Sequence, residues 1–128
     1  MKAYFDYINA KGGANGKRIR LIVKDDASVP AQTFQNAQAL INQNVDLLAG
    51  FTGTPNVALL ARTKTLQKNN IALVGPLTGA DSLRKPFGEE EHKAEQGNYQ
   101  LSADTMTEGH IPQLFHVRAG YGDEARKI

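Results

Sequence analysis

The stretch 45–79 most constrains how this chain can fold, because two short apolar segments flank a helical pattern. Residues 45–51 have the length of a buried strand, and residues 71–74 read as a second strand. Pro55, near the start of the segment between them, is favoured in the first turn of a helix. A strand, a helix and a second strand in this order close as a right-handed parallel crossover. The stretch therefore predicts a parallel α/β sheet.

The helix of this unit is expected from residue 54 to about residue 68, with Thr54 as its N-cap. Leu59, Thr63 and Leu66 fall on one stripe at helical spacing, so this stripe is the expected buried face.

The remaining segments continue the same pattern on both sides. We expect helices at 1–11 and about 28–44, a strand at 19–23, a helical turn at 81–85, a strand at 114–118 and the start of a helix at 123–128. Residues 88–113 are polar and poorly periodic, and we expect a mobile insertion there, with at most a short helix near 89–96. The predicted fold class is a Rossmann-like parallel sheet flanked by helices. Its 128 residues suffice for a single domain.

Small and polar residues follow both strands of the central unit. In open parallel sheets the ligand lies beyond the carboxyl ends of the strands. The candidate binding residues are Thr52, Gly53 and Thr54 after the first strand, and Leu77, Thr78 and Gly79 after the second. Hydroxyls and unpaired backbone amides at such a position suit a small zwitterion.

Composition argues against several other functions. A net charge of +2, from 15 basic and 13 acidic residues, is too balanced to indicate nucleic acid or a membrane surface as a partner. The absence of cysteine rules out a thiolate metal site, and the three histidines are not spaced as metal ligands. Gly50 and Gly53 lack the spacing of a phosphate-binding loop, so no cofactor is expected. The pair Asp25-Asp26 could be catalytic, but a turn at the end of a strand is favoured.

Three parts of the sequence resemble one known family. The run YFDYINAKGGANGKRIRLIVKDD (residues 4–26) is similar to the signature of the type I periplasmic binding proteins of the leucine/isoleucine/valine-binding family. In that signature a helix ends in N-x-x-G-G-x-N-G before a strand that closes on paired acids. PAQTFQNAQALINQNVDLLAGFTGT resembles the family's next helix and strand, while VGPLTGADSLRKPF and LFHVRAGYGDEA resemble its fourth and fifth strand ends. The resemblance covers all but about residues 89–113.

This resemblance implies a two-lobed, non-catalytic receptor, periplasmic or extracellular, that closes on an amino acid or amide and delivers it to the permease of an ABC transporter. The chain would be most of the first lobe, although its amino end is not a secretory signal. In the family, first-lobe loops bind the ligand with hydroxyls and main-chain amides. The resemblance implies the same role for both candidate loops of this chain. Gly79 stands where the family has a hydroxyl residue, and Thr78 can supply that hydroxyl instead. Tyr121 follows the last strand, where the family often has a residue lining the cleft.

Against the family pattern, the first strand is missing ahead of Met1, and the second lobe and hinge are missing after Ile128. In a sheet of order 2-1-3-4-5 the first strand is central, so segments 19–23 and 45–51 would lose a shared neighbour. We therefore expect a homo-oligomer in which copies exchange or pair elements, and weak or no ligand binding. Two alternatives remain. One is an enzyme on a Rossmann-like sheet, which lacks a recognisable nucleophile or nucleotide loop; the other is a regulatory, sensor or assembly module that binds no ligand.

Overall fold

The computed structural model describes residues 1–84 and 111–127. Its helices are α1 (Lys2–Ala10), α2 (Pro30–Ile41), α3 (Thr54–Arg62), α4 (Thr65–Lys68), the 3-10 turn η1 (Asp81–Leu83) and α5 (Tyr121–Ala125), and its strands are β1 (Leu47–Ala49), β2 (Ala72–Val74) and β3 (Leu114–Phe115). Among these residues, none of the helices has the length and apolar character needed to cross a membrane.

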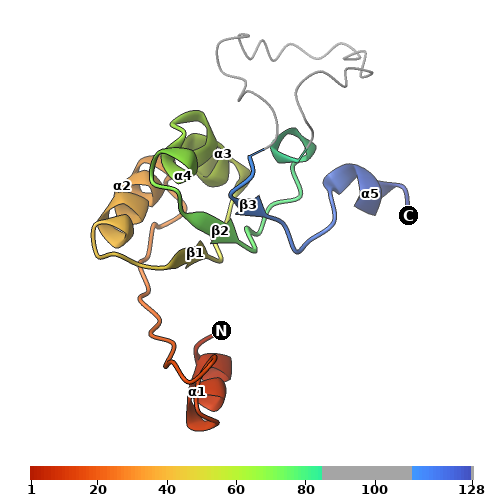
Figure 1. Cartoon of the computed structure of the whole chain (residues 1–128). Coiled ribbons are helices and arrows are strands. Elements are labelled where there is room, and N and C mark those ends of the chain that lie inside the picture. The colour runs from red at the N-terminus through yellow and green to blue at the C-terminus, as the bar shows by residue number, and fades with distance from the viewer. Residues whose placement is uncertain (85–110, 128) are drawn as a thin grey trace, which may run out of the picture.

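The three strands form one parallel sheet in the order β1-β2-β3 (Figure 1). Leu48 is opposite Leu73 in the first pair, and Leu73 is opposite Leu114 in the second. The chain runs from β1 through α3 and α4 into β2, so the parallel strand–helix–strand unit predicted from the sequence is confirmed.

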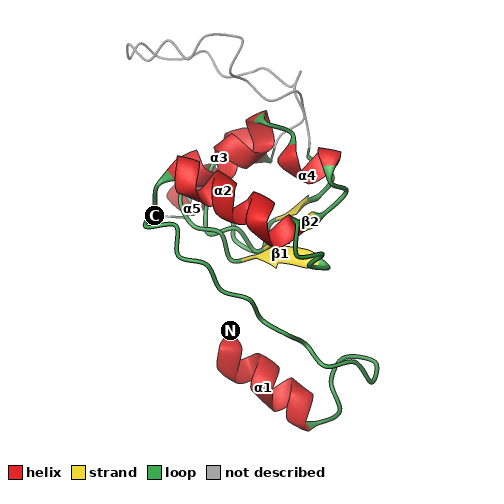
Figure 2. Cartoon of the chain, turned by 90° about the vertical axis from the view of Figure 1, so that its left-hand side faces the viewer, coloured by secondary structure: helices red, strands yellow, loops and turns green. Residues whose placement is uncertain are grey.

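Helices α2, α3 and α4 lie together on one side of this sheet (Figure 2). The core between them and the strands is built from leucines that are almost completely buried: Leu48, Leu60, Leu66 and Leu73. Fully burying a leucine side chain contributes about 1.5–3 kcal/mol, so these four residues stabilise the helical layer on the sheet.

The predicted buried stripe of the central helix was only partly right. Val57, Leu60 and Ala61 are the buried apolar residues of α3, whereas Leu59 and Thr63 are half-buried. The helix also breaks at Lys64, which has a φ of 53° and separates α3 from α4. The buried face of α3 therefore consists of Asn56, Val57, Leu60 and Ala61, and α3 packs against α2.

At the amino end, α1 stands apart from the layered body, on the side of the sheet opposite α2 and α3 (Figures 1 and 2). It ends at the Gly-Gly pair as expected, and every residue in it is at least partly exposed. The Asn9 side chain ties it to the returning chain: Nδ2 donates to the Ile19 carbonyl (2.8 Å), and the Ile19 N–H donates to Oδ1 (2.7 Å).

The expected strand at 19–23 is wrong. These residues are extended but do not join the sheet. A strand requires a neighbour for its backbone hydrogen bonds, and none of the described segments pairs with this one in a sheet. Val23 is consequently 76% exposed.

The carboxyl-terminal elements are shorter or earlier than expected: β3 has two residues, and α5 begins at Tyr121 rather than at residue 123. Most of the expected insertion, with its possible helix near 89–96, lies outside the described residues. Of its last three residues, Ile111 is buried, with 2% exposure, and belongs to the core.

Candidate functional site

The two candidate loops meet at the carboxyl edge of the sheet. The hydroxyl oxygens of Thr54 and Thr78 lie 2.7 Å apart, and either can donate to the other. Pairing continues past the strands as a parallel bridge between Thr52 and Leu77, where the Leu77 N–H donates to the Phe51 carbonyl (2.7 Å). Parallel strands end at the same edge of a sheet, and this arrangement brings both loops into one site.

Thr54 is not the N-cap that the sequence predicted. Gly53, with a φ of 83°, takes that position, and Thr54 is the first residue of α3. Because the Thr54 hydroxyl makes no capping bond to the helix, it is available to face Thr78.

Thr78 is the buried member of the pair, with 0% exposure. Its hydroxyl also accepts a hydrogen bond from the N–H of Ala80 (3.2 Å), which shapes the turn after β2. Thr52 and Leu77 flank the pair at the surface, and both are exposed. The candidate residues thus divide into a hydroxyl pair, half-buried at Thr54 and buried at Thr78, and an exposed rim of Thr52, Gly53 and Leu77.

Tyr121 from the third loop, after β3, completes the site. Its N–H donates to the Gly79 carbonyl (2.6 Å), and its ring lies directly against Gly79. A Cβ atom added at Gly79 would lie 2.5 Å from the Tyr121 Cδ1 atom, so only glycine admits the ring in this position. This contact explains why a hydroxyl residue is not found at position 79.

The Tyr121 ring lies over Gly79, the residue next to Thr78. Hydrogen bonding from the backbone of Gly79, and then from the side chains of Thr54 and Thr78, lowers the pKa of Tyr121 below its ordinary value of 10.0. The structure therefore gathers four of the predicted residues, one of them Gly79, around a single point, with the Tyr121 side chain 46% exposed on its outer side.

Sequence reasoning missed an ion pair beside this tyrosine. The Arg118 guanidinium lies 5.2 Å from the centre of the Tyr121 ring and donates to both carboxylate oxygens of Glu124, at 2.8 Å each. The guanidinium holds the pKa of Glu124 below its ordinary value through these hydrogen bonds. Arginine at the end of a strand was the only signal in the sequence, and it does not specify a partner six residues later.

Asp26 hydrogen-bonds to side chains of two helices, α2 and α3. Its Oδ2 accepts from the Thr33 hydroxyl (2.6 Å) and from the Asn56 amide (3.3 Å), and its Oδ1 accepts from the Ser28 N–H (2.9 Å). Asn56 is in the first turn of α3, so Asp26 connects α2 to the helix that carries Thr54. The bond from Thr33, followed by the one from Ser28, lowers the pKa of Asp26.

Asp25 also accepts a local backbone bond, from the Ala27 N–H (2.9 Å). Both carboxylates therefore shape the turn between residue 24 and α2, which supports the turn interpretation of this pair over the catalytic one.

Residues 1–110 match the periplasmic binding protein family. The chain belongs to this family. Proteins of the family are non-catalytic solute receptors, which confirms at family level both the resemblance drawn from the sequence and the expectation that the chain is not an enzyme.

Solved periplasmic binding proteins have the same fold. A substrate-binding periplasmic protein from Ralstonia solanacearum is 36% identical over 66% of this chain, with a TM-score of 0.62. An extracellular ligand-binding receptor from Verminephrobacter eiseniae is 23% identical over 93%, with a TM-score of 0.69. LivJ, the branched-chain amino acid transporter substrate-binding protein of Streptococcus pneumoniae, solved with isoleucine, is 24% identical over 65%, with a TM-score of 0.53.

The chain spans about a quarter of the length of these proteins, 27% of the first two and 28% of LivJ. No curated protein matches it.

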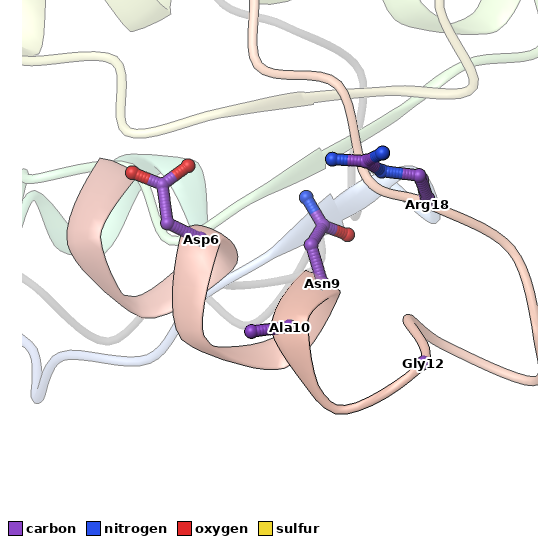
Figure 3. Close-up of a pocket in the computed structure, with 5 residues that line it drawn as sticks. All are labelled: Asp6, Asn9, Ala10, Gly12 and Arg18. Carbon is purple, nitrogen blue, oxygen red and sulfur yellow. The ribbon is translucent and has the colours of Figure 1, made fainter.

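A hollow beside α1 lies away from the three loops. It has a volume of about 520 Å³ between α1 and the returning chain, and it is lined by Asp6, Asn9, Ala10, Gly12 and Arg18 (Figure 3). None of the candidate residues lines it. Within residues 1–84 and 111–127, no cluster of histidine and carboxylate side chains could hold a metal ion.

Proposed function

We propose that this chain forms one wall of the ligand site in a periplasmic or extracellular solute receptor of an ABC transporter. The observation that carries the proposal is the convergence of Thr54, Thr78 and Tyr121, each of which follows one of three strands, at one edge of the parallel sheet. Such an edge is where open α/β sheets bind small ligands.

The chemistry of this wall fits an amino acid or a related small polar solute. Threonine and tyrosine hydroxyls donate to a carboxylate and accept from an ammonium or amide group, so one set of residues serves both ends of a zwitterion. The first turn of α3, with its unpaired N–H groups, favours the carboxylate nearby. The isoleucine in the solved LivJ structure is consistent with this class of ligand.

The exposed rim of Thr52, Gly53 and Leu77 would contact the ligand from the sides. Leu77 is 59% exposed and could contact an apolar side chain. We expect the isolated chain to bind weakly or not at all, because the described residues form only one wall and the ligand would remain open to water on its other side.

Calorimetric titration tests the proposal, with L-leucine, L-valine and small amides as probes. Thr78→Val and Tyr121→Phe each remove one hydroxyl, and each should weaken any measured affinity by about tenfold. Lys68→Ala, on the exposed end of α4, is the control and should bind as the unaltered chain does. Equal affinity in all four proteins would exclude this site.

A second candidate function is assembly, favoured by the unpaired amino-terminal segment. Residues 19–23 are extended outside the sheet, and the outer edge of β1 has no neighbouring strand among the described residues. Two copies could pair or exchange these elements, which would cover the free edge. If so, the chain would be an assembly or regulatory module of the same fold.

Sedimentation at micromolar concentration tests this second candidate. A concentration-dependent dimer that Val23→Lys weakens would support it, because Val23 is an exposed apolar side chain of the unpaired segment. A stable, well-folded monomer would exclude it. A dimer that gives no heat with any probe would favour assembly over solute binding.

A further inference from the structure

We propose that Asp81 and Arg84, on the turn that follows β2, are positioning residues that clamp the β3–α5 loop and thereby hold Tyr121 in the site. The inference rests on the proposed ligand site, but the clamp itself is a structural relationship that can be measured without ligand. Neither residue belongs to the set predicted from the sequence.

Arg84 joins the two loops through one nitrogen. Its Nη2 donates to the carbonyl of Thr78 (3.1 Å) and to the carbonyl of Ala119 (3.3 Å). Thr78 belongs to the loop after β2, and Ala119 lies two residues before Tyr121. The guanidinium therefore fixes the separation between the hydroxyl pair and the segment that carries the tyrosine, and charge-assisted hydrogen bonds of this kind are stronger than neutral ones.

Asp81 hydrogen-bonds to the same β3–α5 segment just after Tyr121. Its Oδ2 accepts a hydrogen bond from the N–H of Gly122 (3.2 Å), in the first turn of α5. Its Oδ1 lies so close to Gly120 that a Cβ atom there would collide with it. The carboxylate thus contacts the backbone on both sides of Tyr121, and its negative charge is favourable at the amino end of a helix.

These polar contacts matter because apolar packing cannot place the tyrosine. Every residue of α5 is at least partly exposed, and β3 contributes only two residues to the sheet. Two further hydrogen bonds join the same segments: the N–H of Tyr121 donates to the Gly79 carbonyl, and the His116 ring bonds to the carbonyl of Leu83 (3.2 Å). Loss of either clamp residue should let the loop swing away from Thr54 and Thr78.

The test follows the ionisation of the Tyr121 phenol by NMR, in protein labelled at the tyrosine ring carbon that bears the hydroxyl. Four tyrosines are present, so Tyr121→Phe assigns the signal. In the unaltered chain the phenol should titrate below its ordinary range, because the Gly79 backbone and then the Thr54 and Thr78 side chains lower its pKa. In Asp81→Ala and Arg84→Ala its pKa should move back up toward 10.

Ser82→Ala is the matched control, because Ser82 is an exposed residue of the same turn. It should leave the Tyr121 titration unchanged. Asp81→Asn should restore much of the shift, since its amide oxygen can still accept from the Gly122 N–H. A merely structural role for Asp81 would not distinguish Asn from Ala in this way.

An unchanged Tyr121 titration in both alanine variants, with far-UV circular dichroism intact, would overturn the clamp. Should either alanine variant unfold, Arg84→Lys replaces it in the same measurement, and it should shift the titration upward. Titration with L-leucine separates the two proposals. If Thr78→Val binds L-leucine as tightly as the unaltered chain while the phenol shifts as expected, the ligand site fails and the clamp stands.

Discussion

The hydroxyls of Thr54 and Thr78 are hydrogen-bonded at 2.7 Å although 24 residues separate them in the sequence. Thr54 is the first residue of α3 and Thr78 lies in the loop after β2. The bond therefore links the start of the helix to the end of the strand–helix–strand unit. The pair also lies beside Tyr121, whose ring contacts the neighbouring Gly79. Stability and the proposed ligand site therefore depend on the same pair of side chains.

Thr78→Val should lower the free energy of unfolding by about 1–3 kcal/mol, the usual effect of leaving buried polar groups without partners. Valine fills the same volume, but the N–H of Ala80 and the Thr54 hydroxyl lose their acceptor or donor. Urea unfolding measures the change. Thr54→Val is the comparison, because Thr54 is only half-buried and should lose less. Equal stability of Thr78→Val and the unaltered chain would contradict the structure.

Gly79→Ala should destabilise the protein by about 1–3 kcal/mol, as overpacking commonly does. The added methyl group would collide with the Tyr121 ring. The cause is a collision with one side chain. Adding Gly79→Ala to the Tyr121→Ala variant should therefore lower the free energy of unfolding much less than adding it to the unaltered chain. The double-mutant cycle, measured by denaturant unfolding, isolates this coupling. Additive effects would show that the ring does not occupy this place.

Local sequence signals predicted the elements that depend on local chemistry. The Gly-Gly pair ended α1, Pro30 opened α2, and the Asn-Gly pair made the turn that brings Ile19 back to Asn9. The carboxyl edge of the sheet was likewise predictable, since the two candidate loops follow directly from the order of strand and helix.

What the sequence could not predict depends on distant neighbours. Residues 19–23 have the composition of a strand, but a strand exists only if another segment lies alongside it. Lys64 interrupts the central helix in a left-handed conformation, and a lysine gives no sequence signal for this conformation. The place of Tyr121 came from family resemblance, and the ties that hold it, from Asp81 and Arg84, join residues 35 to 41 positions apart.

The stability of the protein should fall with acid in a way that depends on Asp26. The pKa of this carboxyl is lowered in the folded state, so its ionisation contributes stability that is fully present above its unfolded value, near 3.8, and is lost as the pH falls through the lower folded value. Unfolding free energies measured between about pH 2 and pH 6 should show this loss, and Asp26→Asn should flatten the profile.

Thr33→Val should flatten the same profile, because the Thr33 hydroxyl makes the largest contribution to the lowered pKa of Asp26. Gln32→Ala, an exposed neighbour on α2, is the control and should retain the profile of the unaltered chain. If Asp26→Asn kept the full loss of stability in acid, another group would be responsible.

Asn9→Ala should release the amino-terminal helix without unfolding the core. The Asn9 side chain both donates to and accepts from the backbone of Ile19, while every residue of α1 is at least partly exposed. Hydrogen exchange should therefore accelerate at the Ile19 amide and along α1, whereas the amide of Leu73, in the buried strand β2, should keep its protection. Lys2→Ala removes only an exposed ion pair with Asp6 and should change little, since such pairs are worth about 0–1 kcal/mol. Faster exchange at Leu73 in Asn9→Ala would show instead that α1 and the sheet unfold as one unit.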